Sequence, residues 1–291
     1  MLKINVIENV SNIARLDVGR SARRGTPEII FAEGKTTEDL LKICSRMLEK
    51  DGRAIVSRFS EEQLTKVEDQ FRSYEIEQAP HARLLVVKRP AFAQSKTGGR
   101  VGIITAGTVD LPVAEEAAIV AREIGCQTFL EADAGVAGIH RLVEPLTGMV
   151  KNNVDCLIVV AGREGALPTV VAGLVDIPII AVPTSSGYGY GGKGLAALMA
   201  MLQACSLGLS VVNIDSGIAA GVVAAQIANR VAKARNSAQL KASRFSDGRR
   251  RSSQLQQTSE KPMIPHRSTS ARLRARHPVH REPQGHQHRH P

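Results

Sequence analysis

Thr105-Ala-Gly-Thr-Val-Asp110 closes the first of five short apolar runs between residues 101 and 217, and a similar turn closes each of the others. The other four turns are Asp133-Ala-Gly-Val-Ala-Gly-Ile-His-Arg141, Ala161-Gly-Arg-Glu-Gly-Ala-Leu-Pro168, Ser185-Ser-Gly-Tyr-Gly-Tyr-Gly-Gly-Lys-Gly194 and Asn213-Ile-Asp-Ser-Gly217. In an open parallel sheet the carboxyl ends of the strands share one edge, where ligands bind. Glycine lets the backbone approach a ligand, and helix N-termini offer unpaired N–H groups to anions. This pattern predicts an enzyme that acts on a phosphorylated small molecule.

The five runs are continuously apolar, which is typical of parallel strands covered by helices on both faces. They span residues 101–105, 128–131, 156–160, 178–182 and 209–213, so each connection has room for a crossover helix. We therefore expect a three-layer α/β domain over residues 96–233. Residues 1–95 hold shorter apolar runs and a helix that starts after Thr36, which predicts a small α/β N-terminal domain.

The net charge of +10 belongs to the end of the chain, because residues 233–291 hold 14 Lys and Arg against three Asp and Glu. Hydrophobic periodicity stops near residue 234, so residues 234–291 are expected to be a disordered, Arg- and His-rich tail. The tail can contact RNA or another polyanion, or it can be an extension without a dedicated partner. We expect no nucleic-acid partner for the rest of the chain.

No two of the four cysteines form a CxxC pair, and their spacings match no metal-binding knuckle. They are expected to be reduced, in a cytoplasmic protein. No signal-peptide pattern opens the chain, and no apolar stretch is long enough to span a membrane.

Polar residues in the first three turns are candidates for chemistry. Asp110 can cap the following helix or face the cleft, while the backbone of Gly107 and Thr108 can hold a phosphate. Arg141 can bind a phosphate or carboxylate through two parallel hydrogen bonds. His140 can move a proton near neutral pH. Glu164 can act as a general base, bind a divalent ion, or only stabilise the helix N-terminus.

The glycine-rich turn fits G-x-x-x-x-G-K from Gly187 to Lys193, but Gly194 replaces the hydroxyl residue that binds Mg²⁺ in nucleotide triphosphatases. The glycines at 187, 189 and 192 still indicate a backbone that wraps a ligand, with Lys193 as a phosphate contact. The last turn adds Asn213 and Asp215. Cys205 is either a buried, inert thiol or one that a nearby cation or base activates.

Together these residues resemble the LarB family, whose proteins contain a PurE-like aminoimidazole ribonucleotide (AIR) carboxylase domain. The resemblance covers residues 17–232. It includes Asp17-x-x-Arg20-x-x-Arg23-x-Gly25-x-Pro27-Glu28, Gly34-Lys35, Ala137-Gly-Ile-His140-Arg141, the Cys205 region and Val212-Asn-Ile-Asp-Ser-Gly217. It implies a PurE- or flavodoxin-like parallel sheet and a homo-oligomer, by analogy an octamer.

The resemblance implies carboxylation of the pyridinium ring of nicotinate adenine dinucleotide at C5 by CO₂, with hydrolysis of its phosphoanhydride. The products would be pyridinium-3,5-biscarboxylate mononucleotide, a precursor in nickel-pincer cofactor synthesis, and AMP. Cys205 would be the nucleophile and Glu164 the base, with Asp110 and His140 as proton carriers. Arg141, Lys193 and the glycine turns would hold phosphate, and Arg20, Arg23 and Lys35 the adenylate half. No organic cofactor is expected, and Mg²⁺ would assist the anhydride step.

Two other functions fit the sequence. One is a PurE-like mutase or carboxylase that acts on a purine ribonucleotide and needs neither Cys205 nor the N-terminal domain. The other is a non-catalytic nucleotide-binding regulator whose basic tail contacts nucleic acid.

Overall fold

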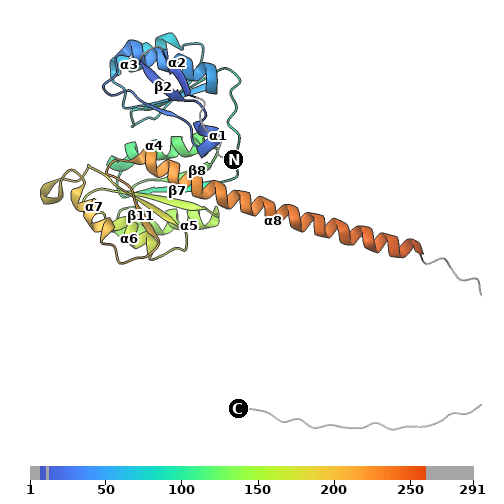
Figure 1. Ribbon diagram of the computed structural model, residues 1–291. Coiled ribbons are helices and arrows are strands. Elements are labelled where there is room, and N and C mark those ends of the chain that lie inside the picture. Colours follow the sequence, from blue (N-terminus) through green and yellow to red (C-terminus); the bar gives the residue numbers. More distant parts are fainter. Residues whose placement is uncertain (1–6, 11–12, 260–291) are drawn as a thin grey trace, which may run out of the picture. The chain divides into compact units, whose positions relative to one another are not determined.

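The computed structural model describes residues 7–10 and 13–259, with side chains to residue 239. The described residues up to 241 form one compact unit. This unit contains a small α/β domain and a larger domain built on a parallel sheet (Figure 1). The predicted α/β fold is confirmed.

The larger domain is built on a five-stranded sheet with the order β11-β10-β9-β7-β8. Its strands are β7 (Arg100–Thr105), β8 (Gln127–Glu131), β9 (Cys156–Ala161), β10 (Ile179–Pro183) and β11 (Leu209–Val211). Every pair of neighbours is parallel, so all five carboxyl ends lie at one edge.

Helices cover both faces of this sheet, which explains its continuously apolar strands. On one face Ile103, Ile158 and Val160 pack against α4 (Leu111–Glu123) and α8 (Gly217–Ser259). On the other, Ile104 and Val159 pack against three shorter helices. These are α5 (Val143–Lys151), α6 (Ala166–Ala172) and α7 (Leu195–Leu202).

The small domain holds a four-stranded sheet with the order β3-β4-β6-β5. Its strands are β3 (Ile29–Phe31), β4 (Arg53–Ser57), β5 (Glu75–Gln78) and β6 (Leu84–Lys88). The hairpin of β1 (Ile7–Val10) and β2 (Ala14–Asp17), and the helices α1 (Arg20–Arg24), α2 (Thr37–Asp51) and α3 (Glu61–Gln70), complete the domain. Thr36 caps α2 by accepting a hydrogen bond from the Asp39 N–H at 3.1 Å, as its sequence predicts.

The two domains share one apolar core through α4. Ile55, Leu84 and Val86 of the small sheet belong to the same buried cluster as Ala114 and Ala117 of α4. Beside that cluster the buried Glu123 carboxylate forms ion pairs with Arg53 at 2.5 Å and with Lys88 at 2.8 Å. The position of the small domain against α4 is therefore fixed by both packing and buried charge.

The sequence analysis places the start of the disordered tail too early in the chain. Helix α8 continues to Ser259, so residues 234–259 are helical rather than disordered. This stretch lacks hydrophobic periodicity, but it holds no proline, and its five Arg, four Gln and three Ala residues have high helix propensity. Residues 260–291 lie outside the described residues. In the described part of the chain no helix is long and apolar enough to cross a membrane.

The close approach of α8 to α4 gives a prediction about Gly221. A Cβ at this position would lie 2.6 Å from the carbonyl oxygen of Ala117, so Gly221→Ala must push the helices apart. We expect a loss of about 1–3 kcal/mol in the free energy of unfolding, measured by urea denaturation. Gly148→Ala in α5 is the control, because a Cβ there meets nothing within 4 Å. Its added methyl should leave stability unchanged or raise it by up to about 1 kcal/mol. Equal effects of the two substitutions would contradict this packing.

Candidate active site

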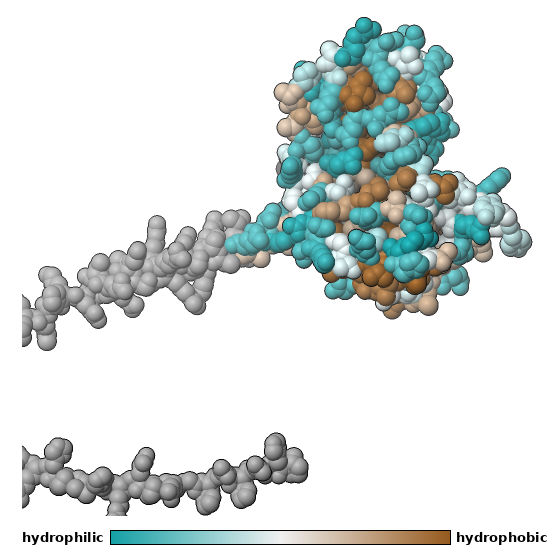
Figure 2. All heavy atoms as spheres, turned by 180° about the vertical axis from the view of Figure 1, so that it is seen from behind, coloured by the Kyte–Doolittle hydropathy of each residue, from teal (hydrophilic) through white to brown (hydrophobic). Residues whose placement is uncertain are grey.

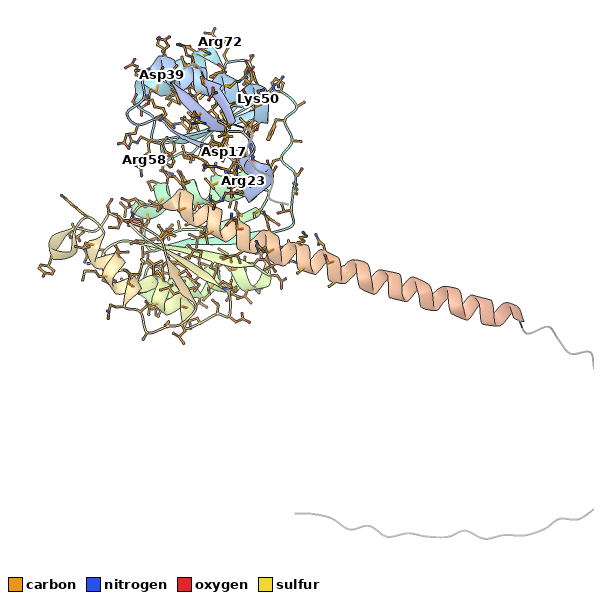
Figure 3. The ribbon with its side chains drawn as sticks, in the orientation of Figure 1. Asp17, Arg23, Asp39, Lys50, Arg58 and Arg72 are labelled. Carbon is orange, nitrogen blue, oxygen red and sulfur yellow. The ribbon has the colours of Figure 1, made fainter. Side chains whose placement is uncertain are left out.

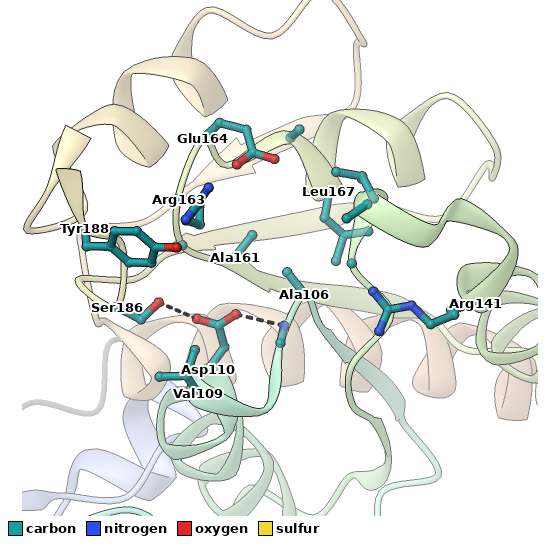
Figure 4. Close-up of a pocket in the computed structure, with 16 residues that line it drawn as sticks. Ala106, Val109, Asp110, Arg141, Ala161, Arg163, Glu164, Leu167, Ser186 and Tyr188 are labelled. Carbon is teal, nitrogen blue, oxygen red and sulfur yellow. Dashed lines mark hydrogen bonds between the residues drawn. The ribbon is translucent and has the colours of Figure 1, made fainter. Parts of the chain in front are cut away.

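A cavity of about 370 Å³ lies at the carboxyl edge of the five-stranded sheet. The turns after β7, β8, β9 and β10 all contribute to its lining, with Gly107, Asp110, Arg141, Glu164 and Ser186 among the residues. Figure 4 shows Arg141 on one side of the cavity and Arg163 and Tyr188 on the other. The edge at which the sequence predicts a ligand therefore carries a cavity, which is lined by four of the five predicted turns.

The Asp110 carboxylate organises the floor of this cavity. It is 2% exposed and accepts hydrogen bonds from the Gly107 N–H at 3.1 Å, the Thr184 hydroxyl at 2.7 Å and the Ser186 hydroxyl at 2.9 Å (Figure 4). It makes no hydrogen bond to the first turn of α4. Of the two roles open from the sequence, the simple helix cap is excluded, and Asp110 instead holds loops together.

The bonds from Asp110 to Thr184 and Ser186 cross over the end of β9, because β9 lies between β7 and β10 in the sheet. Gly162 makes this crossing possible. A Cβ on Gly162 would lie 2.2 Å from the Ser186 oxygen and 2.8 Å from the Thr184 oxygen. This turn therefore requires glycine so that the loops can meet.

Glu164 and Arg163 form the wall that follows β9. The guanidinium of Arg163 lies 4.5 Å from the centre of the Tyr188 ring, and Arg163 has a left-handed backbone with φ of 49°. Glu164 is exposed and lines the cavity beside this cation–π pair. The sequence analysis identified Glu164 but missed Arg163, Tyr188 and Ser186. The run of hydroxyl residues at 184–186, directly after a buried strand, was the available signal for Ser186.

Arg141 reaches the cavity from the 3₁₀ segment η2 (Val136–Leu142). Its guanidinium bonds to Asp133 at 2.8 Å, and both side chains are substantially exposed. The remaining N–H groups of Arg141 stay available for a phosphate or carboxylate in the cavity.

His140 and Thr108 do not line this cavity. His140 instead lines a separate apolar groove together with Leu142, Val143 and Leu146, because the neighbouring side chains of η2 point in different directions. Thr108 is exposed at the start of the 3₁₀ turn η1 (Thr108–Asp110). Within this single chain, neither residue therefore lines the cavity with Asp110 and Glu164.

The glycine-rich turn contributes less than its motif suggests. Gly187 packs behind Arg163, where a Cβ would meet the Arg163 nitrogen at 2.9 Å. Gly189 lies in η3 (Gly189–Gly191), and Gly189, Gly192 and Lys193 are not among the lining residues. In this single chain only Ser186 and Tyr188 from the turn reach the cavity.

Cys205 lies at the opposite edge of the sheet. Helix α7 starts at the carboxyl edge and runs back, so the residues after it meet the amino ends of the strands. Ser206 donates to the Thr169 carbonyl of α6 at 2.9 Å, and Leu209 pairs with Ile179 at the start of β10. Within one chain Cys205 therefore does not reach Glu164. It is nevertheless the exposed thiol among the four cysteines, whereas burial raises the pKa of Cys44 and Cys156 to about 12 and that of Cys126 to about 11.

Arg20 and Arg23 are paired with carboxylates of their own domain. Arg23 pairs with Asp17 through both carboxylate oxygens, and both residues lie in the small domain (Figure 3). Arg20 forms an ion pair with Glu28 at 2.9 Å. The hydrogen bond from Arg23 holds the pKa of Asp17 below its usual range. Lys35 is exposed, away from the cavity. The expectation that these three residues hold an adenylate group is therefore not supported by their positions.

The last turn contributes to a second hollow, called the junction pocket here, with a volume of about 320 Å³. Asn213 is used within its own turn, where its side-chain oxygen accepts from the Ile214 N–H at 2.9 Å. Asp215 lines the junction pocket together with Glu116 of α4 and Arg58, His81 and Arg83 of the small domain. Burial raises the pKa of Glu116 to about 7, against the opposing effect of Arg58 and Arg83.

The Mg²⁺ expected from the resemblance finds no ready set of ligands. Within the described residues no three His, Cys, Asp or Glu side chains gather as metal ligands do. The cavity offers Glu164 and Asp110, and the oxygens of Asp110 already accept three hydrogen bonds.

Comparison with known proteins agrees with this architecture. Residues 7–89 match the LarB/PurE-like N-terminal domain, and residues 100–247 match the AIR carboxylase family. The chain belongs to the AIR carboxylase family and carries the N-terminal domain of LarB. An uncharacterized protein of Methanocaldococcus jannaschii is 41% identical over 232 residues, which cover 78% of this chain and 88% of that protein.

Two similar relatives are named as mutases. The N5-carboxyaminoimidazole ribonucleotide mutase of M. jannaschii is 35% identical over 43% of this chain and 76% of its own length. The mutase of the same name from Thermotoga maritima is 29% identical over 44% of this chain and 74% of its length. The family supports a carboxylase-related enzyme, and each of these two matches covers less than half of the chain.

The raised pKa of Glu116 gives a prediction about pH. The folded protein holds this proton to about pH 7, well above the ordinary value of 4.5. The folded state thus binds more protons between these pH values, and Glu116 destabilises it increasingly as the pH rises through them. Glu116→Gln should therefore raise the free energy of unfolding by about 1–3 kcal/mol at pH 8 and have little effect at pH 4.5. Urea denaturation across this range measures the difference, with the exposed Glu68→Gln as control. A difference that does not change with pH would show that Glu116 titrates normally.

Proposed function

We propose that this protein carboxylates the pyridinium ring of nicotinate adenine dinucleotide at C5 and hydrolyses its phosphoanhydride. The products are pyridinium-3,5-biscarboxylate mononucleotide and AMP. The observation that carries the proposal is the combination of a LarB/PurE-like N-terminal domain with a carboxylase-family sheet whose ligand edge holds Glu164 between cationic groups.

The lining of the cavity supports this chemistry. The substrate is an anion that carries a carboxylate and two phosphates, and Arg141 and Arg163 supply positive charge on opposite sides of the cavity (Figure 4). Glu164 is an exposed carboxylate with no ion pair or hydrogen bond among the described side chains, so it is free to take a proton. Asp110 holds the loops in place and orients Ser186 at the floor.

The reaction needs a nucleophile because a pyridinium ring is too electron-poor to attack CO₂. A thiolate that adds at ring C4 forms a C–S bond and leaves a dihydropyridine, whose C5 is nucleophilic. C5 then attacks CO₂ and forms the new C–C bond. Glu164 removes the C5 proton, and the electron pair of the C–H bond expels the thiolate and restores the aromatic ring.

The sulfur for this step has to come from a second copy of the chain, because Cys205 lies at the far edge of its own sheet. Apolar side chains around it support burial against another molecule, since Leu202 is 66% exposed and Leu207 is 92% exposed. Figure 2 shows that apolar side chains also reach the surface elsewhere on the larger domain. We therefore propose a homo-oligomer in which Cys205 of one copy serves the cavity of another.

Mass spectrometry after incubation with nicotinate adenine dinucleotide and ¹³C-bicarbonate tests the reaction. We expect labelled dicarboxylated mononucleotide and AMP from the wild-type protein. Glu164→Gln should lower the rate by about 100-fold or more, because a general base contributes that much. Glu144→Gln, at an exposed position of α5, is the control and should keep full activity. Unlabelled product alone, or equal rates in the wild type and Glu164→Gln, would contradict the assignment.

Complementation tests the source of the sulfur. Cys205→Ala and Glu164→Gln should each be inactive alone. Mixed and reassembled in equal amounts, they should recover about a quarter of the wild-type activity, because random assembly pairs an intact Glu164 with an intact Cys205 at that frequency. Full activity of Cys205→Ala would remove the covalent step. Inactive mixed oligomers, verified by native mass spectrometry, would show that both residues must come from one chain.

A second candidate is favoured by the relatives named as N5-carboxyaminoimidazole ribonucleotide mutases. In that case the protein would rearrange this nucleotide without Cys205 and without added CO₂. Incubation with N5-carboxyaminoimidazole ribonucleotide, in the same assay format, separates the two reactions.

A further inference from the structure

The junction pocket has a cationic wall and an acidic wall that come from different domains. Arg58, His81 and Arg83 belong to the small domain, and Glu116 and Asp215 belong to the larger one. Figure 3 shows Arg58 on the side of the small domain that faces α4. None of these residues lies in the mechanism proposed above.

The charges in this pocket are not used up by one another. Among the described residues, the side chains of Arg83 and Glu116 make no ion pair and no hydrogen bond. Arg58 pairs with the exposed Glu33 at 3.2 Å, and His81 contacts Glu115 at 2.6 Å, but neither of these carboxylates lines the pocket. The shared apolar core of the two domains keeps the walls in place. Opposite charges that line one cavity without pairing are available to a ligand that carries both an anionic group and hydrogen-bond donors.

Two of the charged residues are held in a costly backbone conformation. Arg58 has φ of 57° and Asp215 has φ of 54°, a left-handed region that costs a non-glycine residue about 1 kcal/mol. Each is fixed by hydrogen bonds, from the Arg58 N–H to the Arg83 carbonyl at 2.8 Å and from the Asp215 N–H to the Pro183 carbonyl at 2.9 Å. The Ser185 N–H also donates to the Asp215 carboxylate at 2.8 Å. Such strain is concentrated where a fold positions side chains for function.

The Glu116 carboxylate is confined on its other side by α8. A Cβ on Gly217 would lie 3.1 Å from a carboxylate oxygen of Glu116, so the glycine leaves the space in which this group sits. The acidic wall of the pocket therefore has a defined position rather than a flexible one.

The junction pocket and the carboxyl-edge cavity share no lining residue, but two short segments link their walls. Asp110 lines the cavity and Pro112 lines the junction pocket, only two residues further along the chain. In the turn after β10, Ser186 lines the cavity and the neighbouring Ser185 donates to Asp215 of the junction pocket. A ligand that occupied both hollows would have to cross these segments.

We propose that the junction pocket binds a nucleoside monophosphate group, with the phosphate at Arg58 and Arg83 and the ribose hydroxyls donating to Glu116 and Asp215. A bare phosphate fits less well, because the acidic wall repels an anion that brings no donor. For a dinucleotide substrate this group is the half that does not react, so the assignment of the pocket to that half rests on the proposed function. The walls themselves require only a ribose phosphate.

Isothermal titration calorimetry on the full chain tests this with AMP, adenosine and nicotinate mononucleotide. We expect wild-type protein to bind AMP at least about tenfold more tightly than adenosine, and Arg83→Met to abolish that preference. Nicotinate mononucleotide also carries a ribose phosphate, so its binding to this pocket should weaken in the same variant. Arg72→Met, at an exposed position of the same domain, is the matched control and should bind all three as the wild type does.

A second comparison does not depend on how well the arginine variant folds. In the wild type 2′- and 3′-deoxy-AMP should bind about tenfold more weakly than AMP, and in Glu116→Ala at least one of them should bind as AMP does. No AMP binding by the wild type, or an unchanged preference for AMP over adenosine in Arg83→Met, would overturn the proposal.

The reaction assay distinguishes failure of this proposal from failure of the proposed function. If both hold, Arg83→Met raises KM for the dinucleotide by about tenfold and leaves kcat unchanged. If the protein does not carboxylate but Arg83 controls AMP binding, the assignment of the pocket is supported and the proposed reaction is wrong. If carboxylation proceeds with unchanged KM in Arg83→Met, the reaction stands and the pocket assignment is wrong.

Discussion

One buried carboxylate organises the ligand edge of this protein. Asp110 draws three donors from two loops, and those loops follow strands that are not neighbours in the sheet. A buried carboxylate is stable only when hydrogen bonds replace those that it loses with water. The three donors to Asp110 therefore have to stay in place, and they hold both loops. Gly162 belongs to the same constraint, because any larger residue would block the hydroxyls of Thr184 and Ser186. The cavity above Asp110 takes its shape from these loops.

Helix α4 transmits this organisation to the small domain. It begins directly after Asp110, and its Ala114 and Ala117 face a core shared by strands of both sheets. Small side chains allow this close packing, and the buried Glu123 at its end binds cations of the small domain. The small domain is consequently part of the wall of a pocket rather than an appendage. This gives a physical reason why a carboxylase-type sheet would carry it, because the added domain supplies the arginines that the larger domain lacks at that place.

The sequence predicts the sheet well because its signal is local. Each apolar run ends at a turn of small residues, and the parallel arrangement brings these turns together without further information. Roles that depend on which way a side chain points, or on where a helix ends in space, were harder to predict from the sequence. His140 and Arg141 are neighbours, yet only Arg141 reaches the cavity, because successive positions of η2 face different ways. Cys205 follows a helix that returns to the far edge of the sheet. The sequence shows the positive charge of Arg20 and Arg23 but not their ion pairs with Glu28 and Asp17, which depend on the folded structure. The junction pocket had no local signal, since its charged residues come from four separate segments.

The two outer helical layers of the larger domain differ in how they are covered. The small sheet packs on α4, whereas the opposite layer of α5, α6 and α7 leaves apolar side chains exposed, among them Val143 at 65% and Leu202 at 66%. A groove of about 740 Å³ runs over α5 and is lined largely by such residues, and it begins at His140, next to the Arg141 that reaches the cavity. Exposed apolar surface of this extent favours association. A second copy of the chain bound in this groove would lie beside the ligand edge. The same association would then bury the exposed apolar side chains and bring a second chain close to the cavity. The exposed thiol of Cys205 belongs to the same layer, and this position is the basis of our proposal that it serves the cavity of another copy.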